Sequence, residues 1–506
     1  MSLMGIDIGS SRCKAAVYTV QGHLVVSTES AYEVTRAEHG RFELDCHAVE
    51  RALYTAIREA ADRSRWDSKY ANDPIQAISV GSFGEAMVPL DQQGAILGPS
   101  IFSHDQRRKD AIARLEALGT ENFYNINANI LGYSYTYPKL VWYQEDAPQV
   151  HERIWKVLSW ADFLVYRLSG NAATNYCHAN RTLLFDLWKE RWSEQLLEAG
   201  GIDGRVLADV VPPATDMGPI LPEMARRLGL PSDVRVIVGG HDQCLNALGA
   251  GAVKGGDSVT GIGTVECTTI IFDGIPDPGT MLSLNLGIEH HVVPGKYVAF
   301  IHNQAGALQT WFLKAFATEL FARGLEEKQI LDLLTLEAPI SPTDTIFLPF
   351  VEPSGAPLFL PAGNGLFSGI GATTGRGELY RALLEGETMF FLQAFEKLQK
   401  HGMRIHDILA TGGGSRSDLW LQIKADMLQR PVRRARYRES GTAGAAIAAG
   451  IASGVYASVD EAVAAFAGTD RNFVPNPAHT SHYETLQKRY GELVEKVLLS
   501  DRSISF

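Results

Sequence analysis

Two glycine turns half a chain apart constrain the fold more than any other feature of this sequence. Residues 7–11 read Asp-Ile-Gly-Ser-Ser and residues 261–264 read Gly-Ile-Gly-Thr, and each turn follows a short run typical of a β-strand. Glycine lets the backbone approach a ligand closely, because it has no Cβ. Consecutive N–H groups beside serine and threonine hydroxyls form a concavity suited to phosphate oxygens. The pair predicts a duplicated α/β unit that holds a nucleoside triphosphate between its copies, with two unrelated hairpins as the alternative.

Composition limits the class of protein. The chain has 506 residues, of which 45% are hydrophobic and 21% are charged, so it is long enough for two or more domains. A net charge of -12 disfavours nucleic acid as a partner. There is no long uncharged apolar run to predict a membrane span, and the polar, glycine-rich start does not resemble a signal peptide. The 5 scattered cysteines fit a reducing compartment, so we expect a cytoplasmic protein.

The negative charge also limits how a nucleotide could be bound. Because the net charge would not attract ATP, affinity must come from backbone donors, helix N-termini and a divalent cation. The sequence contains no GxxxxGK[ST] segment, which excludes a P-loop as the phosphate-binding device. Either the two glycine turns bind the phosphates or the protein does not use ATP.

Apolar periodicity predicts α/β architecture. We expect strands over residues 4–7, 14–19, 75–80, 234–238, 259–261, 266–272 and 408–410. We expect helices over residues 48–63, 379–399, 419–427 and 443–452. Residues 1–3 are typical of an expression tag and are expected to lie outside the fold. Glycines and other small residues cluster at 247–256, which predicts a boundary between two domains, 1–248 and 249–506.

Several short motifs, in this order along the chain, resemble the FGGY family of carbohydrate kinases. They are Asp-x-Gly-Ser-Ser-x-x-Lys at 7–14, Gly-His-Asp at 240–242, Gly-Ile-Gly-Thr at 261–264, Gly-Leu-Phe-Ser-Gly-Ile at 365–370, Glu-Leu-x-x-Ala-Leu-Leu-Glu at 378–385, and Gly-Gly-Gly-x-x-Ser-x-x-Trp at 412–420. The resemblance implies an α/β fold of two actin-like (ribonuclease H-like) ATPase domains around a central cleft. It further implies an N-terminal domain that binds sugar and phosphate, and a C-terminal domain that binds the nucleotide.

Asp242 is the best candidate for a catalytic base. It follows a predicted buried strand and a double-glycine turn, and phosphoryl transfer to an alcohol needs a carboxylate to accept the hydroxyl proton. The resemblance assigns this role to Asp242 and a Mg²⁺-holding role, through water, to Asp7. Helix N-capping by Asp242, or capping of its own turn by Asp7, are the structural alternatives. His241 is expected to be a packed residue rather than a metal ligand.

The resemblance also implies a set of nucleotide contacts, made by hydroxyls, by glycine backbone and by one cation. Lys14 alternates with apolar residues in a predicted strand, so the alternative to a nucleotide contact is a solvent-facing position on that strand. Gly306 would equally suit helix packing. The 412–414 glycines do not form a dinucleotide turn, because GxGxxG is absent. The implied nucleotide-binding residues are Gly9, Ser10, Ser11, Lys14, Gly263, Thr264, Gly306, Gln309, Gly413, Gly414, Ser417 and Asp418.

The sugar side departs from the family pattern. Glu85 matches the acidic hydroxyl-binding residue of glycerol kinases, but the arginine that precedes it there is Gly84 here, and the usual xylulokinase Gln-Met-His-Gly is absent. The family's Trp-Asn-Asp-x-Arg motif corresponds to residues 103–107, Ser-His-Asp-Gln-Arg, which keep the Asp and the Arg but have serine in place of tryptophan. Carboxylates and guanidinium groups suit polyol hydroxyls, although the Asp and Arg of that motif could form a surface ion pair. The expected substrate-binding residues are Ser82, Glu85, Asp105, Arg107 and Gln243.

These features predict an ATP- and Mg²⁺-dependent kinase that phosphorylates a terminal hydroxyl of a small ketose or polyol, with a ketopentose such as xylulose first. A non-kinase ATPase clamp of the actin/Hsp70 type is the main alternative, and a dehydrogenase is disfavoured by the glycine spacing. The expected partners are a small sugar or polyol and ATP/ADP, with no nucleic acid and no membrane. A homodimer remains open.

Overall fold

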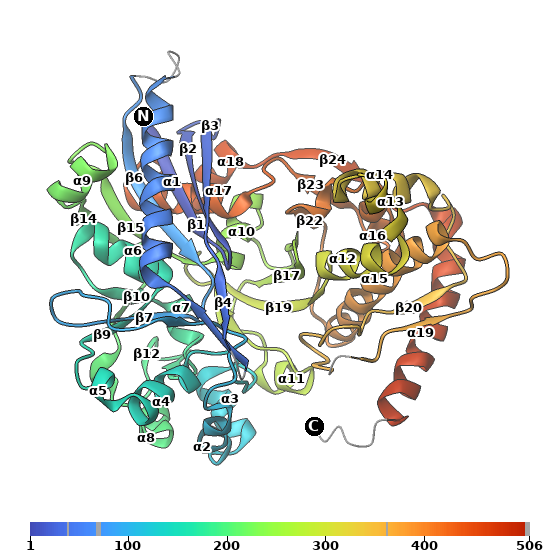
Figure 1. The fold of residues 1–506 in the computed structure, drawn as a ribbon, viewed down its shortest axis with the longest axis horizontal. Helices are drawn as coiled ribbons and strands as arrows, with labels where there is room; N and C mark the ends of the chain where they lie inside the picture. Colours follow the sequence, from blue (N-terminus) through green and yellow to red (C-terminus); the bar gives the residue numbers. More distant parts are fainter. Residues whose placement is uncertain (38–39, 67–71, 361–362, 501–506) are drawn as a thin grey trace.

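The computed structural model describes residues 1–506 except 38–39, 67–71, 361–362 and 501–506. Two lobes lie side by side, each built on a mixed β-sheet (Figure 1). The first half of the chain forms the lobe with the N-terminus, and most of the second half forms the other. The expected fold class, α/β with two domains, is confirmed.

The sheet of the first lobe has six strands. β1 pairs antiparallel with β2 and parallel with β6, and β6 pairs parallel with β15. In spatial order the strands are β14 (Asp216–Pro219), β15 (Arg235–His241), β6 (Ile75–Ser82), β1 (Ser2–Ile8), β2 (Arg12–Thr19) and β3 (Leu24–Ala31).

The sheet of the second lobe repeats this pattern and adds one edge strand. β16 pairs antiparallel with β17 and parallel with β22, and β22 pairs parallel with β23. In spatial order the strands are β18 (Glu289–His290), β19 (Tyr297–Gln304), β17 (Val265–Phe272), β16 (Ser258–Ile262), β22 (Ile408–Thr411), β23 (Val432–Ala435) and β24 (Thr469–Phe473). The first glycine turn joins β1 to β2 and the second joins β16 to β17. The predicted duplication is therefore present.

Helices cover both sheets, and in the described part of the chain none is long and apolar enough to cross a membrane. The longer helices are α1 (Cys46–Trp66), α4 (Tyr137–Asp146), α6 (Trp160–Ser169), α10 (Asp242–Ala250), α12 (Gly306–Phe316), α14 (Glu327–Glu337), α15 (Arg376–Lys400), α16 (Asp418–Leu428), α17 (Ser440–Ala452) and α19 (Thr480–Ser500). One smaller sheet is formed by β4 (Val34–Ala37), β5 (Arg41–Leu44) and β8 (Ser100–Ile101). The other small sheets are pairs of strands: β7 (Met87–Leu90) with β9 (Lys156–Ser159), β10 (Ala173–Asn175) with β13 (Asp209–Val211), β11 (Phe185–Asp186) with β12 (Arg191–Trp192), and β20 (Ile346–Leu348) with β21 (Leu366–Ser368).

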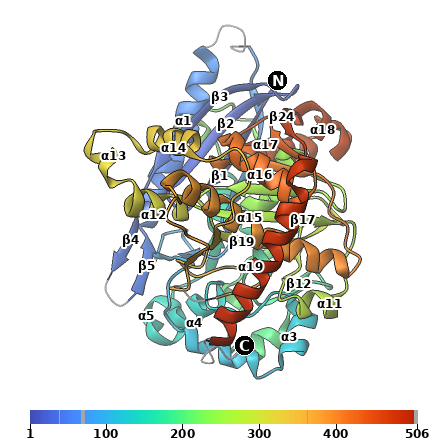
Figure 2. The ribbon, with the colours of Figure 1, turned by 90° about the vertical axis from the view of Figure 1, so that its right-hand side faces the viewer.

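Helices α10 and α17 cross where the two lobes meet. A Cβ on Gly249 would lie 1.9 Å from the carbonyl oxygen of Ser440, and a Cβ on Gly444 would lie 1.9 Å from that of Leu245. Only glycine permits this approach of two helix backbones. A Cβ on Gly5 in β1 would likewise lie 1.8 Å from the carbonyl oxygen of Thr442, so α17 also lies directly on the first strand. Figures 1 and 2 both place α17 beside β1, although it follows β23 in the chain.

The first strand begins earlier than expected. β1 starts at Ser2, and Leu3, which is 1% exposed, lies opposite Tyr18 of β2 and Ala77 of β6. The expectation that residues 1–3 lie outside the fold is therefore wrong, because an apolar Leu3 continues the buried pattern of the strand. The division at residue 248 falls within α10 and stays a prediction.

Candidate active site

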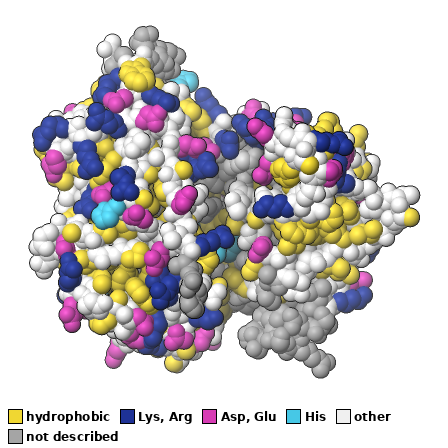
Figure 3. All heavy atoms as spheres, in the orientation of Figure 1, with side chains coloured by type: hydrophobic (Ala, Val, Ile, Leu, Met, Phe, Trp, Pro, Cys, Tyr) yellow, Lys and Arg dark blue, Asp and Glu magenta, His cyan; other side chains and the backbone are white. Residues whose placement is uncertain are grey.

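Three parallel strands of the first lobe end together at one edge of the sheet. Their register places Ile8 of β1, Ser82 of β6 and His241 of β15 abreast. Asp7 and Asp242 therefore come to the same edge, which is where α/β sheets deliver functional side chains. In the space-filling view a furrow separates the two lobes (Figure 3).

The two predicted catalytic carboxylates, Asp242 and Asp7, act on one another electrostatically. Burial, reinforced by the negative charge of Glu85 and opposed by Arg181, raises the pKa of Asp242 to about 6. Burial, reinforced by Asp242 and opposed by Lys14, raises the pKa of Asp7 to about 7. Two adjacent carboxylates withdrawn from water favour a cation between or beside them, and oxygen donors are those that Mg²⁺ prefers. Among the described residues no three His, Cys, Asp or Glu side chains come together as metal ligands, so Asp7 would hold Mg²⁺ through water, and this role stays a prediction.

His241 contacts the candidate base directly. Its Nε2 lies 3.2 Å from Oδ1 of Asp242. Burial, together with the positive charges of Arg181 and His178, holds the pKa of the His241 imidazole well below its usual range, so the ring is neutral. The ring is buried and packs edge-on against Phe300, with 5.3 Å between the ring centroids, as expected of a packed histidine.

Glu85 lies beside Asp242 and is held by an arginine that the sequence reasoning missed. Arg181 donates from Nε (2.8 Å) and Nη2 to Oε1 of Glu85, and from Nη1 (2.6 Å) to Oε1 of Glu289 in β18. A Cβ on Gly84 would lie 2.2 Å from Cδ of Arg181, so the glycine makes room for this side chain. Arg181 thus supplies a guanidinium at Glu85 although the preceding arginine is absent. The one signal for Arg181 in the sequence was the missing arginine before Glu85, because Glu85 then had no predicted cationic partner.

Ser82 and Gln243 lie on the same edge. The Ser82 hydroxyl is buried, donates to the carbonyl oxygen of Phe83 (2.9 Å) and accepts from the N–H of Ala161 (3.1 Å), so it also secures the start of α6. The amide oxygen of Gln243 on α10 is buried without a hydrogen-bond partner among the described residues. Gln243 therefore offers a free acceptor next to Asp242.

Asp105 and Arg107 form a closed ion pair next to the Glu85 loop. Oδ1 of Asp105 accepts from N and Nε of Arg107, both at 2.9 Å, and Oδ2 accepts from Nη2 of Arg107 and from the N–H of Phe42, both at 2.8 Å. Arg107 also pairs with Glu43 at 2.8 Å. Asp105 therefore organises its own loop and strand β5.

The predicted nucleotide residues of the second lobe come together. The N–H of Gly306, at the start of α12, donates to the carbonyl oxygen of Gly263 (3.0 Å), and the N–H of Ala305 donates to that of Thr264 (3.1 Å). β16 and β22 run parallel with Gly261 opposite Thr411, so the 412–414 glycine turn lies beside the second glycine turn. Three segments far apart in the sequence thus meet at one edge of the second sheet.

Four of the remaining residues predicted to bind the nucleotide have side-chain partners in the protein: Lys14, Gln309, Ser417 and Asp418. Lys14 forms an ion pair with Glu439 just before α17, whereas Ser10 and Ser11 are exposed beside the partly buried Gly9. At the second lobe, the Ser417 hydroxyl caps α16 by accepting from the N–H of Trp420 (3.2 Å), and Asp418 pairs with two arginines. Gln309 donates to the Tyr380 hydroxyl at 3.4 Å, while Gly413 and Gly414 lie in the turn itself.

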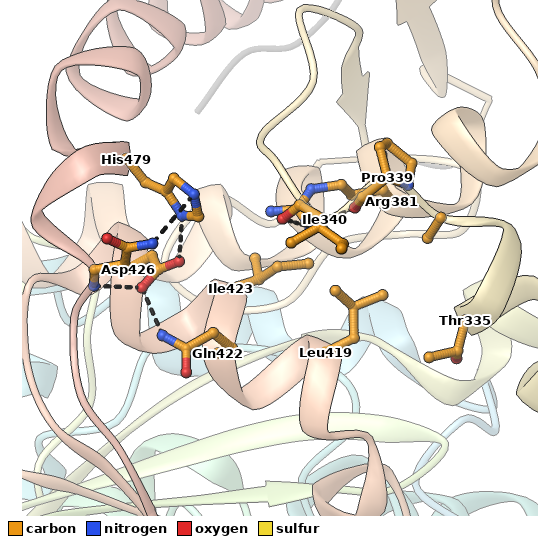
Figure 4. Close-up of a pocket in the computed structure, with 11 residues that line it drawn as sticks. Thr335, Pro339, Ile340, Arg381, Leu419, Gln422, Ile423, Asp426 and His479 are labelled. Carbon is orange, nitrogen blue, oxygen red and sulfur yellow. Dashed lines mark hydrogen bonds and ion pairs between the residues drawn. The ribbon is translucent and has the colours of Figure 1, made fainter.

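A cavity of about 240 Å³ lies in the second lobe, at the end of α14 and beside α15 and α16 (Figure 4). Leu419, Ile423 and Ile340 supply apolar walls. At its polar end Asp426 already accepts from Gln422 (2.7 Å) and lies 2.8 Å from Nδ1 of His479. The cavity contains none of the predicted site residues, and we do not place the substrate there.

Comparisons with known proteins agree with this arrangement. Residues 2–249 match the N-terminal domain of the FGGY family of carbohydrate kinases, and residues 280–453 match its C-terminal domain. A xylulose kinase of Lactococcus lactis is 26% identical over 498 residues, covering 97% of this chain and 96% of that protein. An autoinducer-2 kinase of Klebsiella pneumoniae is 25% identical over 506 residues, covering 96% of this chain and 92% of that protein.

Solved structures share the whole fold. The crystal structure of xylulose kinase from Rhodospirillum rubrum has a TM-score of 0.87 at 26% identity and covers 98% of this chain and 99% of its own. The Plasmodium falciparum glycerol kinase with ADP has a TM-score of 0.85 at 18% identity, covering 100% and 99%. With both family domains matched in order and the duplicated sheets in place, the chain belongs to the FGGY family of carbohydrate kinases, which transfer phosphate to an alcohol acceptor.

Proposed function

We propose that this kinase transfers the γ-phosphoryl group of ATP to a terminal hydroxyl of a small ketose or polyol, with a ketopentose such as xylulose as the first candidate. The observation that carries the proposal is the position of Asp242, a carboxylate with a pKa of about 6 held beside Glu85 at the end of β15. The xylulose kinases among the relatives support the ketopentose, and the autoinducer-2 kinase keeps other acceptors open.

In this proposal Asp242 accepts the proton of the acceptor hydroxyl, whose oxygen then attacks the γ-phosphorus in line with the departing ADP. Ser82, Glu85, Asp105, Arg107 and Gln243 bind or shape the acceptor site. The two glycine turns, Gly306 and the 412–418 segment bind the nucleotide. Asp7 would hold Mg²⁺, which when bound neutralises charge on the phosphates. We further propose that residues 1–248 carry the sugar side, that 249–506 carry the nucleotide side, and that the enzyme works in the cytoplasm.

The test is a coupled ADP-release screen over pentuloses, hexuloses, pentitols, tetritols, glycerol and aldonates. We expect ADP release to depend on one class of acceptor and to be much slower without any acceptor, because closure around the bound acceptor completes the site and excludes water. Fast ATP hydrolysis that no carbohydrate stimulates would instead favour the ATPase clamp.

The pH dependence provides a second prediction. Because a general base must be ionised, the acceptor kcat/KM should fall about tenfold per pH unit below pH 6, where Asp242 becomes protonated. Glu85→Gln should move this acid limb to lower pH, since the negative charge of Glu85 raises the pKa of Asp242. Initial rates at saturating ATP, over about pH 4.5 to about pH 8, measure both the acid limb of the wild type and its shift in the variant. An acid limb that stays in place in the variant would contradict the proposed proximity.

The acceptor site provides a third prediction. Glu85→Ala should raise the acceptor KM about tenfold or more and leave the KM for ATP unchanged, because an uncompensated polar contact costs about 1–3 kcal/mol. Asp105→Ala should also raise the acceptor KM, and in addition lower thermal stability, because its loop and β5 lose their shared acceptor. Initial-rate kinetics and thermal unfolding separate the two effects. Unchanged acceptor affinity in both variants would place the sugar elsewhere.

A further inference from the structure

The cations of the acceptor site are already neutralised by the protein. Arg181 is central, with its side chain 14% exposed between Glu85 (12%) and Glu289 (3%). Its guanidinium lies 5.4 Å from the ring centroid of Tyr135 and 5.9 Å from that of Phe300, which restricts its movement. Arg181 thus joins Glu85 of the first lobe to Glu289 of the second sheet. Burial, opposed by Arg181 and reinforced by the negative charge of Glu85, raises the pKa of Glu289 to about 7.

Lys139 is the other cation close to Glu85, and its donors are used as well. Its ammonium donates to the carbonyl oxygens of Tyr133 (2.9 Å), Ser134 (2.5 Å) and Tyr135 (2.6 Å). An ammonium has three N–H donors, so none is left for a ligand. Burial lowers the pKa of Lys139 to about 7, and the negative charges of Glu85 and Asp105 oppose this shift.

Above about pH 7, where Glu289 is ionised, the surrounding groups leave the site negative. Arg107 is paired with Asp105 and Glu43, and Lys14 with Glu439. Asp242 adds a third carboxylate next to the Arg181 pairs, and Oε2 of Glu289 is buried without a hydrogen-bond partner among the described residues. A carboxylate brought between Glu85 and Glu289 would lose its hydration, while Arg181 and Lys139 already use their donors on protein groups. Another cation of this region is Arg36, which lies over the ring of Phe42 and forms no ion pair with the described residues.

We propose that the Glu85–Arg181–Glu289 triad makes the acceptor site selective for an uncharged polyhydroxy compound and excludes sugar acids of the same length. The proposal rests on the proposed function and deepens it, since it makes Arg181 and Glu289 specificity-determining residues. Hydroxyl groups can donate to the spare carboxylate oxygens, whereas a carboxylate only accepts. Because Glu289 comes from the second lobe, the selectivity requires both lobes.

The test compares matched pairs of acceptors with the full-length enzyme, ATP and Mg²⁺. Each pair consists of an alditol and the aldonate of the same chain length and stereochemistry. One further pair consists of the best uncharged acceptor and its carboxylate counterpart. We expect kcat/KM for the uncharged member to exceed that for the acid by about 100-fold or more, since an uncompensated buried charge is strongly unfavourable. A preferred or equally good aldonate overturns the inference while leaving the kinase function intact. The absence of phosphorylation with every carbohydrate overturns the proposed function itself.

A pair of variants locates the selectivity. Glu289→Gln keeps the shape of the side chain and removes one carboxylate, so the ratio of kcat/KM between uncharged and acidic acceptors should fall about tenfold. Glu145→Gln removes an exposed carboxylate that pairs with Arg108 and Arg114, and should leave this ratio unchanged. The ratio is insensitive to the amount of folded enzyme, which separates selectivity from stability. An unchanged ratio in a folded Glu289→Gln enzyme would overturn the role of the triad.

Discussion

Replacing Asp242 by asparagine should lower acceptor-dependent ATP turnover by about 100-fold or more, because general-base catalysis contributes about 10²–10⁴ to the rate. Asparagine keeps the size of the side chain, so the contact with Nε2 of His241, which lies 3.2 Å from Oδ1, can stay in place. Acceptor and ATP binding should therefore stay within several-fold of the wild type. Coupled ADP release and calorimetry measure the two quantities separately.

The matched control is Asp216→Asn. Asp216 lies on β14, the edge strand of the same sheet, where it pairs with Arg235 at the start of β15 and not at the carboxyl ends of β1 and β6. We expect its turnover to equal that of the wild type. Turnover within threefold of the wild type in folded Asp242→Asn enzyme would remove Asp242 from the role of base.

Gly444→Ala should destabilise the protein by about 1–3 kcal/mol, because overpacking a filled interior forces backbone shifts. The added methyl group would lie 1.9 Å from the carbonyl oxygen of Leu245, and neither helix backbone can move without disturbing the other. α10 begins at Asp242, so activity should fall as well. Thermal and urea unfolding measure the first effect and ADP release measures the second.

Gly274→Ala is the appropriate control, since a Cβ there would meet nothing within 4 Å. Its stability should match the wild type closely. If both alanine variants unfold at the same temperature, the glycine crossing of α10 and α17 does not constrain the two lobes.

The duplicated sheets, and the choice of Asp7 and Asp242 as candidate site residues, could be predicted from the sequence for a local reason. Each aspartate belongs to or follows an apolar run and lies two residues from a glycine, and the carboxyl ends of parallel strands share an edge. Local patterns could not place Arg181, which lies 96 residues from Glu85 and 108 from Glu289 and belongs to no motif. Leu3 was missed for a different reason, because three residues are too few to show alternation.

The interlocking of the lobes has a consequence for dividing the chain. α17 covers β1 and crosses α10, yet it lies beyond residue 248, so a fragment of residues 1–248 would lose the helix that covers Gly5. The complementary fragment would expose Ala443, Ala446 and Ile447, all fully buried in the intact protein. Neither fragment should therefore be soluble by itself, whereas coexpression should let the two halves assemble. We therefore expect the two sequence domains of this kinase to unfold together, in one cooperative transition.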